Sequence, residues 1–294
     1  MSTKFSEMKL KHKIIFKFFD IMRTSNIHRL YNTKKSPKLT SDFKLVYFCG
    51  AEGINYLNAS LVSIHKYWNT LPEILIISDG TPLEKIQSQL VPWPKKVDLI
   101  SWKEAADHFR NTGNKDLADY AQNELWGKKY VSILYCAAQF PLLYSDTDIL
   151  WFADPQKKLP LTHPVLKMGN DILHCYSNEM LEALNLTALN NQAPLNAGLI
   201  FANGDFSAYP GWVSICKYLK EKADFRTEQT SFAILNKYFN PEDFFSLDEV
   251  LIKINDEYSF QFTRKAHKHI LARHYVNMKS TTFWRDFMYM LAKK

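Results

Sequence analysis

The chain has 294 residues, of which 46% are hydrophobic and 23% are charged. This length suits one large α/β domain or two small ones, and the apolar content excludes an intrinsically disordered chain. The net charge of +7 would suit a nucleic-acid partner, but residues 1–40 carry +8 and leave −1 on the remainder. Because a nucleic-acid enzyme spreads basic residues over a face of its folded domain, we expect no nucleic-acid partner.

The first segment, residues 5–31, has the pattern of a basic amphipathic helix. Lysines lie between apolar residues at helical spacing, namely Leu10, Ile14, Phe18, Ile21 and Met22. Such a helix binds an anionic membrane surface or an acidic partner, or packs on the body with a solvated basic face, and the pattern leaves these readings open. Residues 33–41 read as a linker, so we divide the chain into an arm and linker over 1–40 and one domain over 41–294.

The domain continues as alternating strands and helices. We expect strands at 44–49, 73–78, 96–101, 141–145, 171–175, 197–202 and 270–275. We expect helices at 55–68, after Pro82, at 103–110, at 115–139 with Gly127 as a possible break, and at 206–222, 227–239 and 281–291. The β-α-β-α-β order predicts an α/β fold with a mostly parallel, Rossmann-like central sheet and helices on both faces.

The four cysteines and the N-terminal residues bear on the compartment. None of the cysteines forms a CxxC pair and each lies in an apolar run, as buried reduced thiols do. No secretory signal is visible, and no apolar run approaches the roughly 18–20 residues that span a bilayer. We therefore expect a cytoplasmic protein without a transmembrane segment, with possible peripheral contact at the inner face of a membrane through residues 5–31.

The strongest local feature is the pair Asp146 and Asp148, which follows the hydrophobic strand at 141–145. In extended chain, residues two apart point to the same face, and ligands of open α/β sheets bind at this end of the strands. Two acids in a turn are often simply solvated. Here apolar residues on both sides place them at the edge of a core, where like charges need a cation. The pair therefore indicates a divalent metal that could hold a pyrophosphate.

Four motifs together resemble a known family. They are Gly127-Lys-Lys-Tyr130 with Leu142-Leu-Tyr-Ser-Asp-Thr-Asp-Ile-Leu-Trp-Phe-Ala-Asp-Pro155, then Asn196-Ala-Gly-Leu-Ile-Phe-Ala202, Thr227-Glu-Gln-Thr230, and His274-Tyr-Val-Asn-Met-Lys279 with Phe283-Trp284. In this order they resemble nucleotide-diphospho-sugar transferases of the GT-A fold, and are most similar to the retaining glycosyltransferase families 8 and 77. The resemblance covers about residues 45–286. It implies a metal-dependent glycosyltransferase that moves a hexosyl or pentosyl group from a nucleotide-sugar, with UDP as the expected nucleotide.

The resemblance also implies roles for individual residues. Asp146, Asp148 and His274 would hold Mn²⁺ or Mg²⁺ on the donor's diphosphate, and Lys279 would stabilise the departing nucleotide. Donor binding would fall to Phe48, Cys49, Gly50, Ala51, Lys128 or Lys129, and Thr147. Asn196, Glu228 and Gln229 would line the sugar and acceptor side. Taken singly, these residues have plainer readings: a core histidine, a turn cap, first-turn helix residues, or a solvated lysine face.

The chemistry agrees with this division of roles. Because the leaving nucleoside diphosphate gains negative charge, a metal and a lysine aimed at it contribute most to catalysis. In a retaining enzyme Gln229 or Glu228 would lie on the far face of the donor sugar, whereas in an inverting enzyme Glu228 would deprotonate the acceptor hydroxyl. The sequence leaves open which applies, and whether the acceptor is a glycan, a lipid or a protein.

Other enzyme classes lack their motifs. Gly50 and Gly53 do not form a GxGxxG fingerprint, Gly127-Lys128-Lys129 is not a P-loop, and no GxSxG elbow occurs. Two alternatives remain open on the same kind of sheet: a nucleotidyltransferase and a non-catalytic sugar-binding module.

Overall fold

The structure is a computed structural model that describes residues 14, 17, 39–160, 163–240, 243–252, 270–276 and 279–292. The side chains of Leu39, Lys279 and Ser280 lie outside this description. The arm predicted over residues 5–31 also lies outside it, except for Ile14 and Lys17, so its contact with a membrane stays a prediction. Within the described ranges, no helix combines the length and the apolar character that crossing a membrane requires.

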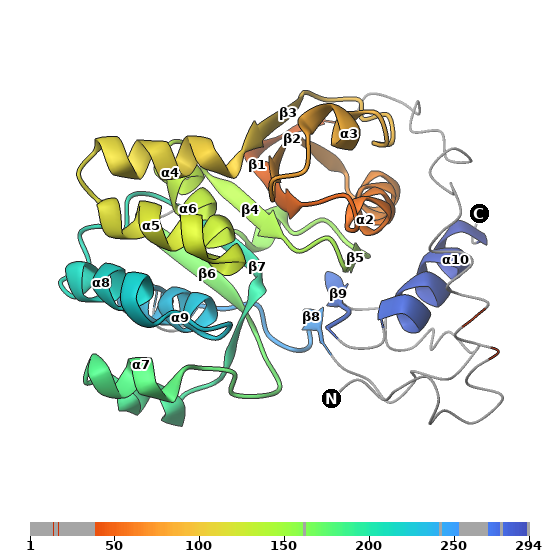
Figure 1. Ribbon diagram of the computed structural model, residues 1–294. Coiled ribbons are helices and arrows are strands. Elements are labelled where there is room, and N and C mark those ends of the chain that lie inside the picture. Colours follow the sequence, from red (N-terminus) through yellow and green to blue (C-terminus); the bar gives the residue numbers. More distant parts are fainter. Residues whose placement is uncertain are drawn as a thin grey trace.

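A six-stranded sheet forms the centre of the domain, in the order β3-β2-β1-β4-β7-β6 (Figure 1). Its strands are β1 (Leu39–Cys49), β2 (Thr70–Ser78), β3 (Val97–Ser101), β4 (Leu142–Ser145), β6 (Val165–Asn170) and β7 (Leu195–Asn203). The first four run parallel, and β7 is antiparallel to both of its neighbours. The carboxyl ends of β1, β2, β4 and β6 therefore share one edge with the start of β7.

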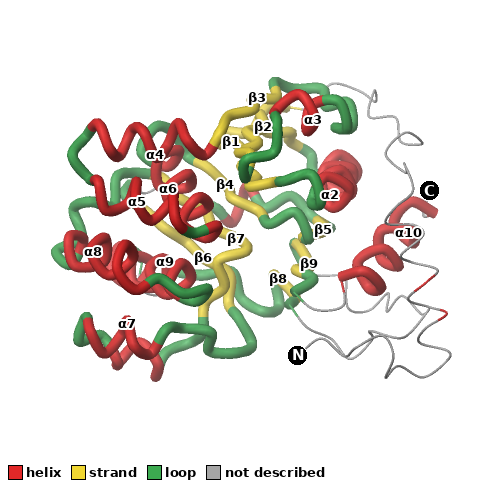
Figure 2. The backbone as a smooth tube through the Cα atoms, viewed as in Figure 1, coloured by secondary structure: helices red, strands yellow, loops and turns green. Residues whose placement is uncertain are grey.

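Helices cover both faces of this sheet, because neighbouring strand residues point to opposite sides (Figure 2). Val46 of β1 belongs to one hydrophobic core, whereas Leu45 and Tyr47 belong to the other. The first core packs under α4 (Trp102–Asn111), α5 (Lys115–Asn123), α6 (Leu125–Ala137), α7 (Asn178–Ala183), α8 (Trp212–Lys222) and α9 (Thr227–Phe239). The second packs under α2 (Ile54–Tyr67), α3 (Leu83–Gln87) and α10 (Trp284–Ala292). The predicted mostly parallel α/β sheet is confirmed.

A small second sheet extends the domain beyond the end of β4. It has the order β5-β9-β8, with β5 at Ile149–Trp151, β8 at Val250–Leu251 and β9 at Ala272–His274. Strands β5 and β9 are antiparallel, with Ile149 opposite His274. A π-helical turn, Lys279–Phe283, then leads into α10. This sheet brings the C-terminal segment beside the residues that follow β4.

Two expected elements were placed wrongly. The strand expected at 171–175 lies upstream, at Val165–Asn170, and the expected range is a loop. The helix expected at 115–139 is two helices, and the break falls at Glu124, which is extended, instead of at Gly127. Gly127 lies inside α6 because it lets the helix approach α5: a Cβ there would lie 2.3 Å from the carbonyl oxygen of Tyr120.

All four cysteines are free thiols, as expected, and three of them are buried, whereas Cys175 is only partly buried. Burial raises the pKa of Cys49 and of Cys136 to about 12, so both thiols stay protonated at neutral pH.

Candidate metal centre and ligand site

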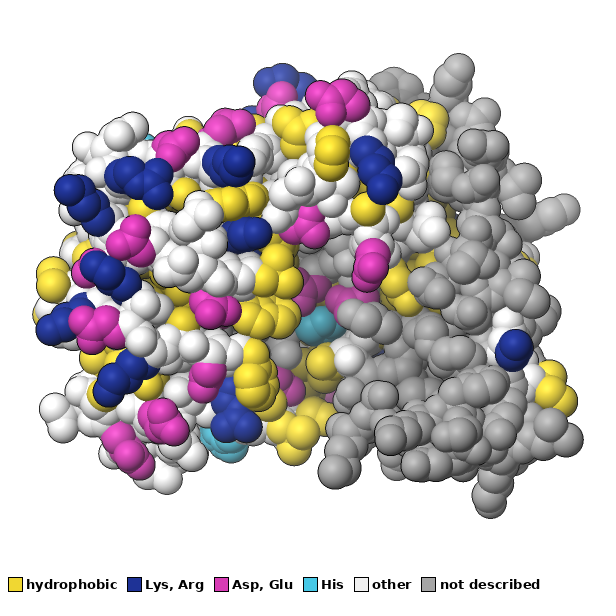
Figure 3. Space-filling view, in the orientation of Figure 1, with side chains coloured by type: hydrophobic (Ala, Val, Ile, Leu, Met, Phe, Trp, Pro, Cys, Tyr) yellow, Lys and Arg dark blue, Asp and Glu magenta, His cyan; other side chains and the backbone are white. Residues whose placement is uncertain are grey.

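Asp146, Asp148 and His274 come together at the carboxyl end of β4. One ligand atom from each lies within 4.8 Å of the others. The Nε2 atom of His274 is 3.6 Å from Asp146 Oδ2 and 3.4 Å from Asp148 Oδ1. Asp148 and His274 are buried and Asp146 is partly exposed, so the group opens to solvent on one side. In Figure 3 a histidine and acidic side chains share a hollow on the face of the molecule.

Strand pairing fixes the backbone on which these side chains stand. The Asp146 amide donates to the carbonyl of Gly198 in β7 at 2.7 Å, which continues the β4–β7 ladder by one residue. The Tyr275 amide donates to the carbonyl of Asp148 at 3.0 Å, which ties the turn after β4 to β9. Residues distant in sequence are thus held in register by backbone bonds on either side of the acid pair.

Gly198 makes room for the histidine. A Cβ at this position would lie 2.2 Å from Cε1 of His274 and 2.8 Å from Oδ1 of Asn196. The imidazole therefore rests directly against the backbone of β7. The three donor atoms, two of them carboxylate oxygens and one an imidazole nitrogen, are close enough for one divalent cation to contact all of them. The residues present fit a metal ion.

The electrostatics of the group favour positive charge at its centre. Burial lowers the pKa of His274, but the carboxylates of Asp148 and Asp146 outweigh it, and the net pKa is raised. Burial also raises the pKa of Tyr144 well above its usual range, and the neutral phenol donates a hydrogen bond to Asp146 Oδ1 at 2.5 Å. The acid pair thus attracts a proton to the imidazole, as it would attract a cation.

Lys129 and Glu228 form a buried ion pair beside the acids. The Nζ atom of Lys129 lies 3.1 Å from Glu228 Oε1 and 3.3 Å from Asp146 Oδ1, and it donates to the carbonyl of Ala197 at 3.0 Å. Burial alone would lower the pKa of Lys129, but the carboxylates of Asp146 and Glu228 raise it, so it stays cationic. Burial raises the pKa of Glu228 despite the nearby ammonium group. Lys129 therefore links α6, α9 and β4 at one point, and is not a solvated face lysine.

Asn196 lies beside Gly198 in β7, and Gln229 follows Glu228 in α9. The Nδ2 atom of Asn196 donates to Asp171 at 2.8 Å, and its Oδ1 accepts the Gly198 amide at 2.8 Å, so this buried side chain is fixed from both ends. Gln229 lies in the first turn of α9, and its buried Nε2 has no hydrogen-bond partner within the described residues.

The end of β1 lies beside the end of β2, where Cys49 pairs with Ser78. A Cβ on Gly50 would lie 1.9 Å from Asp79 Oδ2, so a larger residue would displace that carboxylate. The amide of Ala51 donates to Thr81 at 3.1 Å, and Lys128 Nζ reaches the carbonyl of Asp79 at 3.3 Å. Phe48 and Cys49 precede this turn in β1. The region has the small residues and polar groups that a nucleotide could approach.

The structure gives few or no side-chain contacts for two of the predicted residues, Thr147 and Lys279. Thr147, between the two acids, is partly exposed, and its Oγ1 faces Gly53. Lys279 begins the π-helical turn after β9, but its side chain lies outside the described residues, so its contact with phosphates stays a prediction.

A buried polar cluster behind His274 escaped the sequence reasoning. Arg273 and Tyr275, on either side of His274, bond to Asp286 of α10 at 2.7 and 2.8 Å, and Arg285 bonds to the same carboxylate at 2.7 Å. Alternate residues of a strand point to opposite faces. The cluster therefore holds β9 from one face, while His274 points from the other face toward the acids. The sequence feature that could have predicted this cluster is Asp286 in an otherwise apolar helix, because a buried carboxylate needs partners. Asp171 and Tyr144 also belong to the site and were not singled out.

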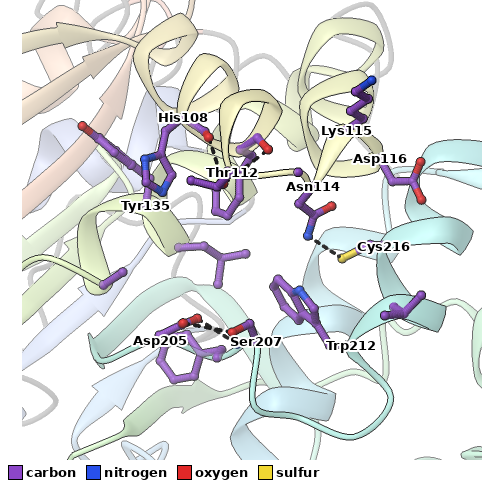
Figure 4. A pocket seen from close by; sticks show the side chains of 16 residues that line it. His108, Thr112, Asn114, Lys115, Asp116, Tyr135, Asp205, Ser207, Trp212 and Cys216 are labelled. Carbon is purple, nitrogen blue, oxygen red and sulfur yellow. Dashed lines mark hydrogen bonds between the residues drawn. The ribbon is translucent and has the colours of Figure 1, made fainter.

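A cavity of about 600 Å³ lies at the other edge of the sheet, where α6 and β7 end (Figure 4). Its polar side chains bond to neighbours: Asn114 donates to the sulfur of Cys216 at 3.4 Å, and Ser207 to Asp205 at 2.9 Å. None of the predicted site residues lines it. It is therefore separate from the metal centre.

Comparison with known proteins gives one kind of match. No family model and no curated protein matches the sequence. Among solved structures, the galactosyltransferase LgtC with donor and acceptor sugar analogues aligns with a TM-score of 0.53 at 12% identity, over 85% of this chain and 95% of that one. The bifunctional glycosyltransferase WbbM gives 0.54 at 16% identity, over 88% of this chain and 51% of that one. Mouse xyloside xylosyltransferase 1 gives 0.50 at 11% identity, over 80% and 98%. The resemblance predicted from the four motifs is thus confirmed at the level of the fold: the chain has the GT-A architecture of these glycosyltransferases.

Proposed function

We propose that this protein is a metal-dependent glycosyltransferase that uses a nucleotide-sugar donor. The observation that carries the proposal is the convergence of Asp146, Asp148 and His274 at the carboxyl end of β4. Open α/β sheets bind ligands at that edge, and a divalent cation with oxygen and nitrogen ligands suits a diphosphate. The glycosyltransferase fold of the neighbouring structures supports the same reading.

We assign the metal-binding and donor-binding roles to the following residues. Asp146, Asp148 and His274 would hold Mn²⁺ or Mg²⁺, which supplies charge stabilisation to the departing diphosphate. The turn at Gly50 and Ala51, with Lys128 beside it, would receive the nucleotide, and Lys279 would add positive charge near the phosphates.

The sugar side is formed by Asn196, Glu228 and Gln229. Glu228 is held by Lys129 at 3.1 Å and is 4% exposed, which leaves it poorly placed to take a proton from an incoming hydroxyl. Gln229 follows Glu228 in the first turn of α9, and its buried Nε2 has no hydrogen-bond partner within the described residues. We therefore infer a retaining reaction, in which the Gln229 side chain stabilises the positive charge that develops on the sugar.

The test is release of nucleoside diphosphate from a panel of nucleotide sugars, with Mn²⁺, with Mg²⁺ and with EDTA. We expect turnover of at least one donor with metal, none with EDTA, and a loss of about 100-fold or more in Asp148→Asn. Asp205→Asn, at the far edge of the sheet, is the matched control and should keep full activity.

Other products would contradict the proposal. Release of pyrophosphate would indicate a nucleotidyltransferase, and tight binding of a glycan without any turnover would indicate a sugar-binding module. Activity that is unchanged in Asp148→Asn would remove the proposed metal centre.

A further inference from the structure

The cavity at the edge of the sheet opposite the metal centre, which we call the far-edge cavity, has the build of a ligand site (Figure 4). Its volume of about 600 Å³ falls within the range of small-molecule pockets, roughly 300–1,000 Å³. Its walls come from the end of α4 and the turn into α5, the end of α6, the loop after β7 and the start of α8. Because these segments are parts of the folded domain, the space is already formed without a ligand.

Aromatic rings from three helices line the far-edge cavity. They are Phe109 of α4, Tyr135 of α6 and Trp212 of α8, and each of them is only partly buried. His108 packs against Tyr135 with the ring centroids 5.1 Å apart, which holds the phenol ring in place. In Figure 4 the indole of Trp212 projects toward the open space. Rings that stay open to solvent inside a cavity offer an apolar face on which a ligand can stack.

Polar groups beside these rings have bonding capacity left. Asn114 donates to the sulfur of Cys216 at 3.4 Å, which is a weak acceptor, and its other N–H has no partner among the described residues. Asp205 accepts the amide and the hydroxyl of Ser207, both at 2.9 Å, and each carboxylate oxygen keeps a further lone pair. The carboxylate is therefore fixed at the rim, where it can accept a hydrogen bond from a hydroxyl group. Lys115 adds an exposed ammonium group as a donor.

The lining selects a neutral ligand that carries hydroxyl groups. Its charges are mixed, because Lys115 opposes Asp205, and Asp116 is already paired with Lys220 at 2.8 Å. A wholly apolar ligand would cover the amide of Asn114 and the carboxylate of Asp205 without bonding to them, which is costly. A pyranose instead has an apolar C–H face that stacks on aromatic rings, and hydroxyl groups at its edge that both donate and accept. The groups in the cavity match this chemistry.

We propose that the far-edge cavity binds a short stretch of a neutral glycan, at a site separate from the metal centre. Trp212 and Tyr135 stack on the sugar rings, and Asn114 and Asp205 bond to the hydroxyl groups. Lys129 lies in the first half of α6 and Tyr135 near its end, so one helix contributes to both sites. A glycan held in the cavity leaves the metal centre free, and keeps the protein close to the polymer that it binds.

The experiment titrates the full chain with neutral disaccharides, namely cellobiose, maltose, lactose and N,N′-diacetylchitobiose. Isothermal titration calorimetry measures the affinity, and fluorine NMR of fluorotryptophan-labelled protein reports the place of binding. The resonance of Trp212 is assigned by its absence from Trp212→Phe. We expect saturable binding of at least one sugar, together with a shift of the Trp212 resonance. Trp212→Ala should weaken this binding by roughly ten-fold or more, because it removes the aromatic anchor.

Trp126→Ala is the matched control, because Trp126 is 40% exposed and does not line the cavity. Trp126→Ala and Asp148→Asn should both bind the sugar as the unmodified protein does. If Trp212→Ala fails to fold, Asp205→Ala, at an exposed position, should weaken binding by about five-fold or more.

Three results would overturn the inference: no saturable binding of any sugar, equal affinity in Trp212→Ala, or loss of binding in Asp148→Asn. A shift of the Trp212 resonance with the apolar dye anilinonaphthalene sulfonate, but with none of the sugars, would also overturn it and would mark an apolar docking site. Donor turnover does not depend on this cavity, so a failure here leaves the proposed function standing.

Discussion

Gly198→Ala tests the metal centre through a single methyl group. The added Cβ would lie 2.2 Å from His274 Cε1, whereas ordinary contacts begin at 3.4 Å, so the imidazole must retreat by about 1.2 Å. A shift of this size breaks the geometry of a metal ligand, and we expect Mn²⁺ affinity to fall by about 10–100-fold. Overpacking of the same site should lower the free energy of unfolding by about 1–3 kcal/mol.

The assay is a Mn²⁺ titration that counts free ion by electron paramagnetic resonance, with thermal unfolding of the metal-free protein measured in parallel. Gly169→Ala is the matched control on the neighbouring strand, because its added Cβ meets nothing closer than Leu199 Cβ at 3.9 Å. The control should bind Mn²⁺ as the unmodified protein does. Equal Mn²⁺ affinity in the two variants would refute the placement of His274 against Gly198.

Three further predictions concern ion-paired side chains. Asp286→Ala removes the carboxylate that two buried arginines share, and should lower the free energy of unfolding by about 3–5 kcal/mol. Tyr275→Phe, which removes one hydrogen bond to the same carboxylate, should lower it by about 1 kcal/mol. Urea denaturation measures both losses, and equal losses would contradict the cluster. Lys129→Met should lower the free energy of unfolding by about 3–5 kcal/mol, and the double variant Lys129→Met/Glu228→Gln should regain much of that loss. A double variant that is no more stable than the single variant would show that the two side chains are not coupled. The pKa of Glu249 is lowered, because bonds from the Ser246 amide and Lys158 outweigh its partial burial, so its contribution is present above pH 4.5 and is lost as the pH falls through the lowered value. Glu249→Gln should therefore lower the melting temperature at pH 7 and lose that effect in strong acid, and a difference that persists there would count against the assignment.

Much of the fold was predictable because its main elements carry strong patterns. The strands β1, β2 and β4 are apolar runs that end at turn residues, and Asp146 and Asp148 follow one of them directly. By contrast, β5, β8 and β9 have two or three residues each, too few for a period to show. These short strands place His274 beside Asp146 and Asp148. The resemblance to a known family was therefore the only basis for predicting this contact.

The errors share a physical cause, which is that sequence patterns show polarity but not tertiary contact. The apolar run beginning at Ile172 indicated a strand, yet the structure leaves Ile172 and Leu173 exposed in a loop. Gly127 indicated a helix break, yet it serves the close packing of α6 on α5. The Asp286 cluster depends on side chains from β9 and α10 whose partners no local spacing reveals. The roles of Asn196, Glu228 and Gln229 in catalysis remain predictions that need substrate.

The most direct test of the central claim is to identify the atoms that surround a single bound Mn²⁺ in the presence of UDP. Pulsed electron paramagnetic resonance on the ¹⁵N-histidine-labelled protein should show one coupled imidazole nitrogen together with phosphorus from the diphosphate, and the nitrogen coupling should vanish in His274→Ala. Phosphorus coupling without any histidine nitrogen, or a nitrogen signal that persists in His274→Ala, would contradict the account.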